Sequence, residues 1–132
     1  MITELVAVGT EILLGNIVNT NSAYLAEKCA QLGLSLYYQT VVGDNEQRMK
    51  DTIKTALDRS DVVILTGGLG PTKDDLTKEI TAEVMGLPLV EDAHSRELLD
   101  AYLKQYEKND AQRRIKIGRA SCRERVFWVV GV

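Results

Sequence analysis

The chain has 132 residues, of which 45% are hydrophobic and 27% are charged, and its formal net charge is −3. This length suits one domain with a sizeable core. No apolar run approaches the roughly 20 residues that a membrane span needs, and no stretch resembles a signal peptide. Two cysteines, Cys29 and Cys122, argue against a disulfide framework. We therefore expect a cytoplasmic protein with no membrane partner.

Charge is distributed unevenly along the chain. Residues 1–112 carry 10 basic and 18 acidic side chains, a net −8, whereas residues 113–132 carry 6 basic and 1 acidic, a net +5. An acidic body repels phosphate backbones, so we expect no nucleic-acid partner for it. The basic end would suit DNA or anionic lipid only if it is native.

The chain begins with a predicted strand and a long connection. Residues 1–8 are apolar and β-branched, and Gly9 ends the strand. Residues 10–21 are too apolar for a disordered loop, so we expect them to fold over the end of the sheet. Asn21 or Ser22 would then cap the next helix.

A helix and a second strand follow. Gly33 ends the predicted helix 22–32, and residues 34–42 alternate as a strand does. The apolar face of this helix comprises Tyr24, Leu25, Cys29 and Leu32. Asp44 and Gln47 have the spacing of a capping box at the start of another helix. The buried stripe of that second helix comprises Met49, Ile53, Ala56 and Leu57.

The third predicted strand, 62–65, is a continuous apolar run, as in a parallel sheet buried on both faces. A glycine-rich loop separates it from a helix that begins near Thr72 or Lys73 and ends at Gly86. The face of this helix comprises Leu76, Ile80 and Val84. A further helix begins at Glu91 or Asp92, with a face of Leu98 or Leu99, Tyr102, Leu103 and Tyr106.

Strands that alternate with helices predict an α/β fold: a three-layer α/β/α arrangement with a mostly parallel, Rossmann-like sheet. Each of three connections, 10–21, 43–44 and 67–75, directly follows a strand. All three therefore lie at the carboxyl edge of one sheet, where open α/β sheets bind ligands.

The connection at 67–75 has the chemistry of a phosphate site. Gly67, Gly68 and Gly70 leave the backbone N–H groups accessible to an anion, and Asp74 and Asp75 follow. These acids could hold a divalent metal ion or activate a water molecule. The spacing matches neither a P-loop nor the dinucleotide fingerprint, so a tight turn that only joins strand to helix stays an alternative.

For the acids of the other two connections, Glu11 and Asp44, the sequence allows either a structural or a functional role. Glu11 is the lone acid in an apolar connection, where a carboxylate is either paired or functional. Asp44 is either a helix cap or a member of the site, and Asp74 and Asp75 could merely stabilise a helix N-terminus.

The stretch from Thr66 to Thr77, TGGLGPTKDDLT, resembles the signature of the molybdopterin-binding (MoaB/Mog-like) domain, in the variant of the CinA competence/damage-inducible family. Two further stretches agree, VGTEILLG at 8–15 with NTNS at 19–22, and VGDN at 42–45. The resemblance covers roughly residues 2 to 110. It implies a metal-dependent pyrophosphatase that acts on ADP-ribose-like substrates in a full-length, homo-oligomeric parent protein.

The resemblance also implies roles for individual residues. Asp75 and Asp44 match the two acids of the molybdopterin branch, and Asp74 joins them as a catalytic candidate and, with Asp75, as a metal ligand. The expected binding residues for a phosphorylated, ADP-ribose- or pterin-like ligand are Thr66, Gly67, Gly68, Gly70, Pro71, Thr72, Glu11 and Asn21. Leu69 and Asp74 depart from the molybdopterin enzymes, which favours the CinA branch over molybdopterin as the cofactor. The alternative is a non-catalytic binding or assembly module.

Residues 113–132 do not continue this pattern. IGRASCRERV at 117–126 resembles translated sequencing-adapter DNA, so we expect a partial domain over 1–112, incomplete at its C-terminus, and a non-native tail over 113–132. The alternative is a genuine basic tail. A truncated sheet would leave the fragment marginally stable, and activity would belong to the parent.

Overall fold

The computed structural model describes residues 1–70, 72–91, 93–94, 96–98 and the backbone of 128–130. In chain order the elements are β1 (Ile2–Val8), α1 (Thr10–Leu13), α2 (Thr20–Gln31), β2 (Ser35–Val42), α3 (Glu46–Arg59), β3 (Val62–Thr66), α4 (Thr77–Met85) and β4 (Trp128–Val130). No helix in this described part is long and apolar enough to cross a membrane.

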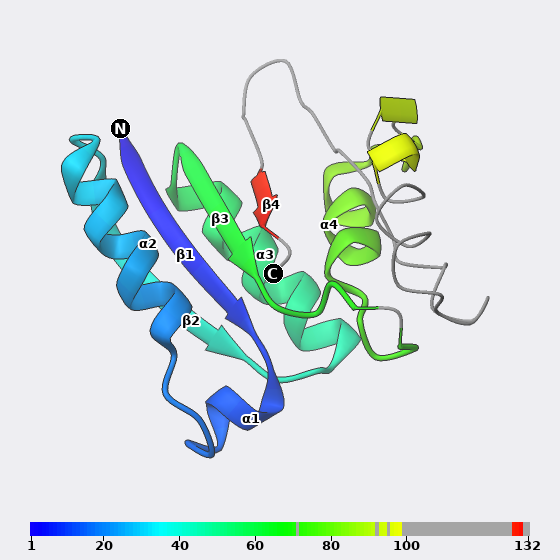
Figure 1. Ribbon diagram of the computed structural model, residues 1–132, viewed down its shortest axis with the longest axis horizontal. Helices are drawn as coiled ribbons and strands as arrows, with labels where there is room; N and C mark the ends of the chain where they lie inside the picture. Colours follow the sequence, from blue (N-terminus) through cyan, green and yellow to red (C-terminus); the bar gives the residue numbers. More distant parts are fainter. Residues whose placement is uncertain (71, 92, 95, 99–127, 131–132) are drawn as a thin grey trace.

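The strands form one parallel sheet in the order β2-β1-β3-β4. α2 covers one face, and α3 and α4 cover the other (Figure 1). This arrangement confirms the predicted α/β, Rossmann-like fold. β4 lies within the range 113–132, whose assignment to a non-native tail stays a prediction.

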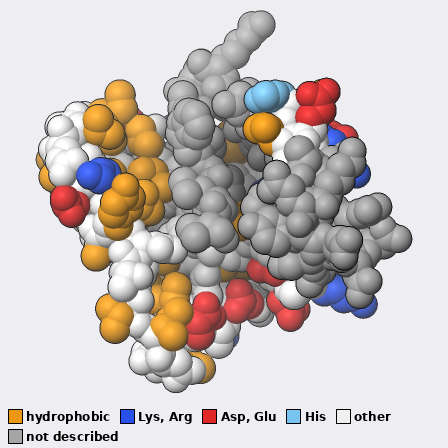
Figure 2. Space-filling model, viewed as in Figure 1, with side chains coloured by type: hydrophobic (Ala, Val, Ile, Leu, Met, Phe, Trp, Pro, Cys, Tyr) orange, Lys and Arg blue, Asp and Glu red, His pale blue; other side chains and the backbone are white. Residues whose placement is uncertain are grey.

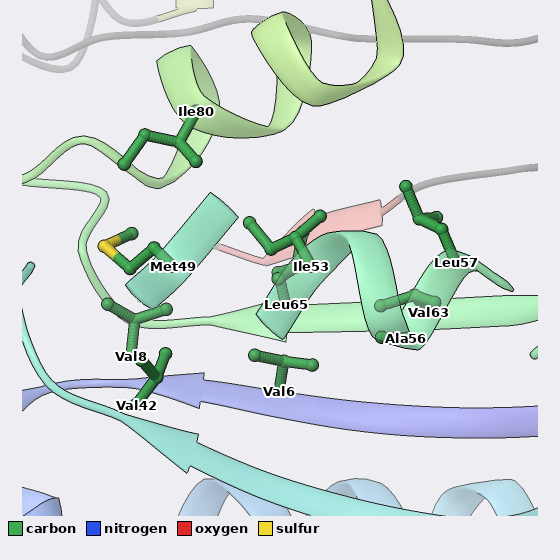
Figure 3. Packing of buried hydrophobic residues seen from close by; sticks show 10 residues of the cluster. All are labelled: Val6, Val8, Val42, Met49, Ile53, Ala56, Leu57, Val63, Leu65 and Ile80. Atoms are coloured by element: carbon green, nitrogen blue, oxygen red, sulfur yellow. The ribbon is translucent and has the colours of Figure 1, made fainter. Parts of the chain in front are cut away.

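The main core lies between the sheet and α3 (Figure 3). The predicted stripe of α3 is confirmed, since all four of its residues are buried. Val6 and Val8 of the central strand β1 point into this core, and Ile80 of α4 closes it. Leu5 and Ala7 alternate with these valines and point to the opposite face of the sheet. They are also buried, because helices cover both faces of this central strand.

The predicted apolar face of α2 is only partly buried. Cys29 is 3% exposed, but Tyr24 is 61% and Leu32 76% exposed. The reason is the position of α2 at the edge of the sheet, where fewer neighbours are available. The cap is also different: Asn19 accepts a hydrogen bond from the N–H of Ser22 at 3.1 Å, so Asn19, not Asn21 or Ser22, caps α2.

Both later helices begin after the predicted positions. Asn45, not Asp44, caps α3, because its side chain accepts from the Arg48 N–H at 3.1 Å. α4 begins at Thr77, after a loop, and ends at Gly86 with φ 65°, as the sequence predicts. Most of the helix expected from Glu91 or Asp92 lies outside the described residues.

A buried acid lies near the amino end of the sheet. Glu4 of β1 is fully buried, and its carboxylate accepts from Arg59 at 2.7 and 2.9 Å, from Thr40 at 3.0 Å and from Ser60 at 3.3 Å. The Arg59 guanidinium lies 3.8 Å from the ring centroid of Tyr38. Burial alone raises the pKa of Glu4, but the hydrogen bonds and the positive charge of Arg59 outweigh it and lower that pKa below the ordinary value.

Candidate functional site at the carboxyl edge of the sheet

The three predicted connections do meet at one end of the molecule. β1, β2 and β3 all point toward the lower end in Figure 1, and Asp and Glu side chains gather at that end in Figure 2. The loops after these strands are the connection 9–19, the turn 43–45 and the glycine loop 67–76. The site is built from these loops, with β1 between the other two strands.

The glycine loop has a backbone that only glycine suits at two positions. Gly67 has φ 89° and Gly68 has φ 62°. A Cβ atom on Gly67 would lie 2.0 Å from the carbonyl oxygen of Val8, and one on Gly68 would lie 2.2 Å from Oγ1 of Thr77. The loop is therefore fixed on one side by the end of β1 and on the other by the start of α4.

Thr77 fastens this loop to α4. Its side chain is fully buried, its Oγ1 donates to the Gly67 carbonyl at 2.9 Å, and its N–H donates to the Gly68 carbonyl at 3.2 Å. Thr77 belongs to the motif at 66–77, but no role was predicted for it from the sequence. The signal was its position at the end of the motif, immediately before the apolar helix.

Asp75 closes the second half of the loop. Its Oδ2 accepts from the Thr72 N–H at 3.0 Å and from the Thr72 hydroxyl, and it lies beside Gly70, where a Cβ atom would be 2.6 Å away. Asp74 is exposed, and its carbonyl accepts from the N–H of Leu76 at 3.1 Å. Both acids lie in the loop before α4. Through its bonds to Thr72, Asp75 holds this loop in shape.

Asp44 joins the loop after β2 to the loop after β1. Its Oδ2 accepts from the Thr10 N–H at 3.1 Å and from the Thr10 hydroxyl at 2.8 Å. The Thr10 Oγ1 in turn accepts from the Asp44 N–H at 3.1 Å. The capping interpretation of Asp44 is therefore wrong, because the residue is used between loops. Thr10 was missed because a lone threonine after a glycine carries no distinctive pattern.

Two other candidates lie beside these loops. Asn21, in the first turn of α2, donates from Nδ2 to the Thr66 hydroxyl at 3.4 Å, which brings α2 to the end of β3. Glu11 is exposed rather than set in apolar surroundings, and its carboxylate lies beside Gly9, where a Cβ atom would be 2.8 Å from Oε1. Pro71 lies outside the described residues.

The candidates thus form two hydrogen-bonded centres rather than one cluster. Asp44 with Thr10 lies on the β2 side of β1, and Asp75 with Thr72 lies in the loop after β3. The described residues contain no group of three or more His, Cys, Asp or Glu side chains arranged to hold a metal ion. An ion here would therefore take at most one or two carboxylates and complete its shell from a ligand, as Mg²⁺ does with phosphates.

Comparison with known proteins agrees with this arrangement. The family model described as "Probable molybdopterin binding domain" matches residues 4–128. A competence-damage inducible protein of Lactiplantibacillus plantarum is 55% identical over 108 residues, which are 82% of this chain and 26% of that protein. One of Streptococcus equi is 57% identical over 102 residues, 77% of this chain and 24% of that protein. The chain spans about a quarter of these relatives.

Solved structures show the same fold. The protein CinA from Thermoplasma acidophilum, whose function is described as unknown, matches with a TM-score of 0.73 and 34% identity over 87% of this chain and 67% of that chain. The tungsten cofactor synthesizing protein MoaB from Pyrococcus furiosus matches with a TM-score of 0.63 and 21% identity over 94% of this chain and 76% of that chain. The chain belongs to the molybdopterin-binding domain family, in its competence-damage inducible (CinA) branch.

Proposed function

We propose that the carboxyl edge of the sheet binds the phosphates of an ADP-ribose- or pterin-like small molecule and, in the full-length protein, hydrolyses its pyrophosphate. The observation that carries the proposal is the glycine loop, held between Val8 and Thr77 beside the Asp75 carboxylate. Such a loop is ordered before the ligand arrives, so little entropy is lost on binding.

Backbone donors in this loop support phosphate binding. No hydrogen bond to another described residue occupies the N–H groups of Gly68, Leu69 or Gly70. Phosphate oxygens accept such bonds well when consecutive N–H groups line one turn. The net charge of −8 over residues 1–112 makes these backbone donors, rather than a basic patch, the anion-binding element.

The acids suit the reaction. Oδ2 of Asp75 accepts from the N–H and the hydroxyl of Thr72, which orients this carboxylate beside the glycine loop. Asp44, fixed by Thr10, offers a second carboxylate across the end of β1. One acid would orient or deprotonate the attacking water, and Asp74 with Asp75 would hold a divalent ion. The ion would neutralise charge on the phosphate oxygens.

A non-catalytic binding module is the second candidate, because the family model that matches residues 4–128 is described as a probable molybdopterin binding domain. Turnover of ADP-ribose with Mg²⁺, with and without chelator, separates the two in a full-length protein that carries this domain. Pyrophosphatase activity predicts release of AMP and ribose 5-phosphate that chelator abolishes. Binding of ADP-ribose or molybdopterin without turnover supports the module, and absence of binding by either ligand contradicts both.

A further inference from the structure

Two hydrogen bonds from one residue set the orientation of the glycine loop. Thr77, the first residue of α4 (Figure 1), donates from Oγ1 to the Gly67 carbonyl at 2.9 Å and from its N–H to the Gly68 carbonyl at 3.2 Å. A trans peptide unit is planar, and its C=O and N–H point in opposite directions. The N–H groups of Gly68 and Leu69, which belong to the same two peptide units, therefore point away from Thr77.

These two successive N–H groups lie on one side of the chain. Extended backbone would turn them to opposite sides, but Gly68 has φ 62°, a left-handed conformation that allows both peptide units to face the same way. Neither N–H donates to a described residue, and Gly68 and Leu69 are both partly exposed. The side of the loop opposite Thr77 therefore offers two backbone donors to an anion.

The loop has little space to turn between its two neighbours. A Cβ atom on Gly67 would lie 2.0 Å from the Val8 carbonyl oxygen, and one on Gly68 would lie 2.2 Å from Oγ1 of Thr77. A side chain at position 77 that lacked a hydroxyl would leave the Gly67 carbonyl without its donor in this confined place, which is costly for a buried polar group. The hydroxyl of Thr77 therefore favours the orientation that is observed.

The hydroxyl of Thr77 differs from that of another buried threonine on the same helix. Thr81, one turn later, donates from Oγ1 to the Thr77 carbonyl at 2.6 Å, the usual bond of a threonine inside a helix. Thr77 instead donates out of its helix to the loop. Its side chain is fully buried, so it acts on a ligand only through the loop.

We propose that Thr77 is a positioning residue, which holds the Gly67 and Gly68 carbonyls so that the N–H groups of Gly68 and Leu69 face a phosphate of the ligand. This inference rests on the proposed function, because it assigns the donors of the same phosphate site. It extends that function to a buried side chain that the ligand does not contact.

Matched threonine variants test the proposal in a full-length protein that carries this domain. The probe is the α,β-methylene analogue of ADP-ribose, which is not hydrolysed, with Mg²⁺ present. Its affinity for the wild type, Thr77→Val, Thr77→Ser and Thr81→Val would be measured by calorimetry, together with the melting temperature of each protein. Thr77→Val keeps the shape of the side chain but removes the hydroxyl, so affinity should fall at least about tenfold.

The other two variants separate positioning from packing. Thr77→Ser keeps the donor, and its affinity should stay within about threefold of the wild type. Thr81→Val removes a comparably buried hydroxyl without changing a bond to the loop, so it should lose melting temperature but not affinity. In turnover of ADP-ribose, Thr77→Val should raise KM more than it lowers kcat, because the loop holds the phosphate in the ground state and the transition state alike.

Amide hydrogen exchange gives a readout that needs no variant. Binding of the analogue should slow exchange at Gly68 and Leu69 in the wild type, and this result decides the proposal if Thr77→Val does not fold. A wild type that does not bind the analogue would contradict the proposed function as well.

Three results would overturn the role of Thr77 while the proposed function stands. They are unchanged affinity in Thr77→Val, an equal loss of affinity in Thr77→Ser or Thr81→Val, and unprotected Gly68 and Leu69 amides in the ligand-bound wild type.

Discussion

Two kinds of acidic residue occupy opposite ends of the same sheet. Glu4 is fully buried near the amino end, with Arg59, Thr40 and Ser60 as hydrogen-bond partners. Asp44 and Asp75 lie in loops at the carboxyl edge, where each is held through one oxygen by a threonine. The acids at the two ends carry the same charge and differ mainly in how deeply their side chains are buried.

The difference separates an acid held inside the fold from the acids proposed to act on a ligand. Both carboxylate oxygens of Glu4 are occupied by the chain itself, so its lowered pKa reports a structural ion pair. Asp75 lies in a loop at the carboxyl edge, where its Oδ2 accepts from Thr72 beside the backbone of the glycine loop. We expect substitutions at Glu4 to change stability, and substitutions at the carboxyl edge to change ligand handling.

The largest effect is expected for Glu4→Gln. Removing the charge leaves the Arg59 guanidinium without its partner, and we expect a loss of about 3 kcal/mol in unfolding free energy. Urea denaturation measures it. Glu83→Gln, which removes an exposed partner of Lys50, is the control and should lose less than about 1 kcal/mol. Equal losses in the two variants would remove the distinction between the buried acid and exposed acids.

Gly67→Ala should come next. The new Cβ atom would overlap the Val8 carbonyl, and the residue would also be strained at φ 89°. Gly33→Ala is the matched control, because Gly33 has φ 70° but no atom within 4 Å of the added carbon. We expect the Gly67 variant to lose about 2 kcal/mol more than the control in urea denaturation. A difference near zero would mean that the loop is not held against β1.

The pH dependence of the unfolding free energy should show how much the ionised Glu4 contributes to stability. Its folded pKa lies below the ordinary value of 4.5, so its contribution is complete above that pH and is lost as pH falls through the folded pKa. Urea denaturation from pH 7 to pH 3 should show a steeper acid loss for the wild type than for Glu4→Gln. Parallel curves would show that the ion pair does not control acid stability.

A smaller loss of stability should distinguish the helix cap Asn45 from its neighbour Asp44, which binds Thr10. Asn45→Ala removes the cap of α3 and should cost about 1 kcal/mol. Asp44→Asn keeps that cap and should reduce turnover or ligand affinity more than stability. Thermal melts beside activity assays check this. A larger loss of stability for Asp44→Asn would restore the interpretation of Asp44 as a cap.

Sequence patterns predicted the parts of the fold that depend on local periodicity. The strand at 62–65, the buried stripe of α3 and the stop at Gly86 follow from alternation, helical spacing and glycine. Connections between distant segments were not predictable in the same way. The Asp44–Thr10 bonds join residues 34 positions apart, and Glu4 meets Arg59 across 55 positions. Cap positions were shifted because several neighbouring Asn, Asp and Ser residues can serve equally well locally.

The central claim concerns Asp75 and is tested by Asp75→Asn in a full-length protein that carries this domain. We would measure ADP-ribose turnover, ligand affinity and melting temperature together, with Asp58→Asn, an exposed acid of α3 with no role in the site, as the control. A catalytic Asp75 predicts that turnover falls by at least 100-fold, on the scale of acid–base catalysis, with affinity nearly unchanged. Unchanged turnover in Asp75→Asn, or loss of melting temperature alone, would contradict the account.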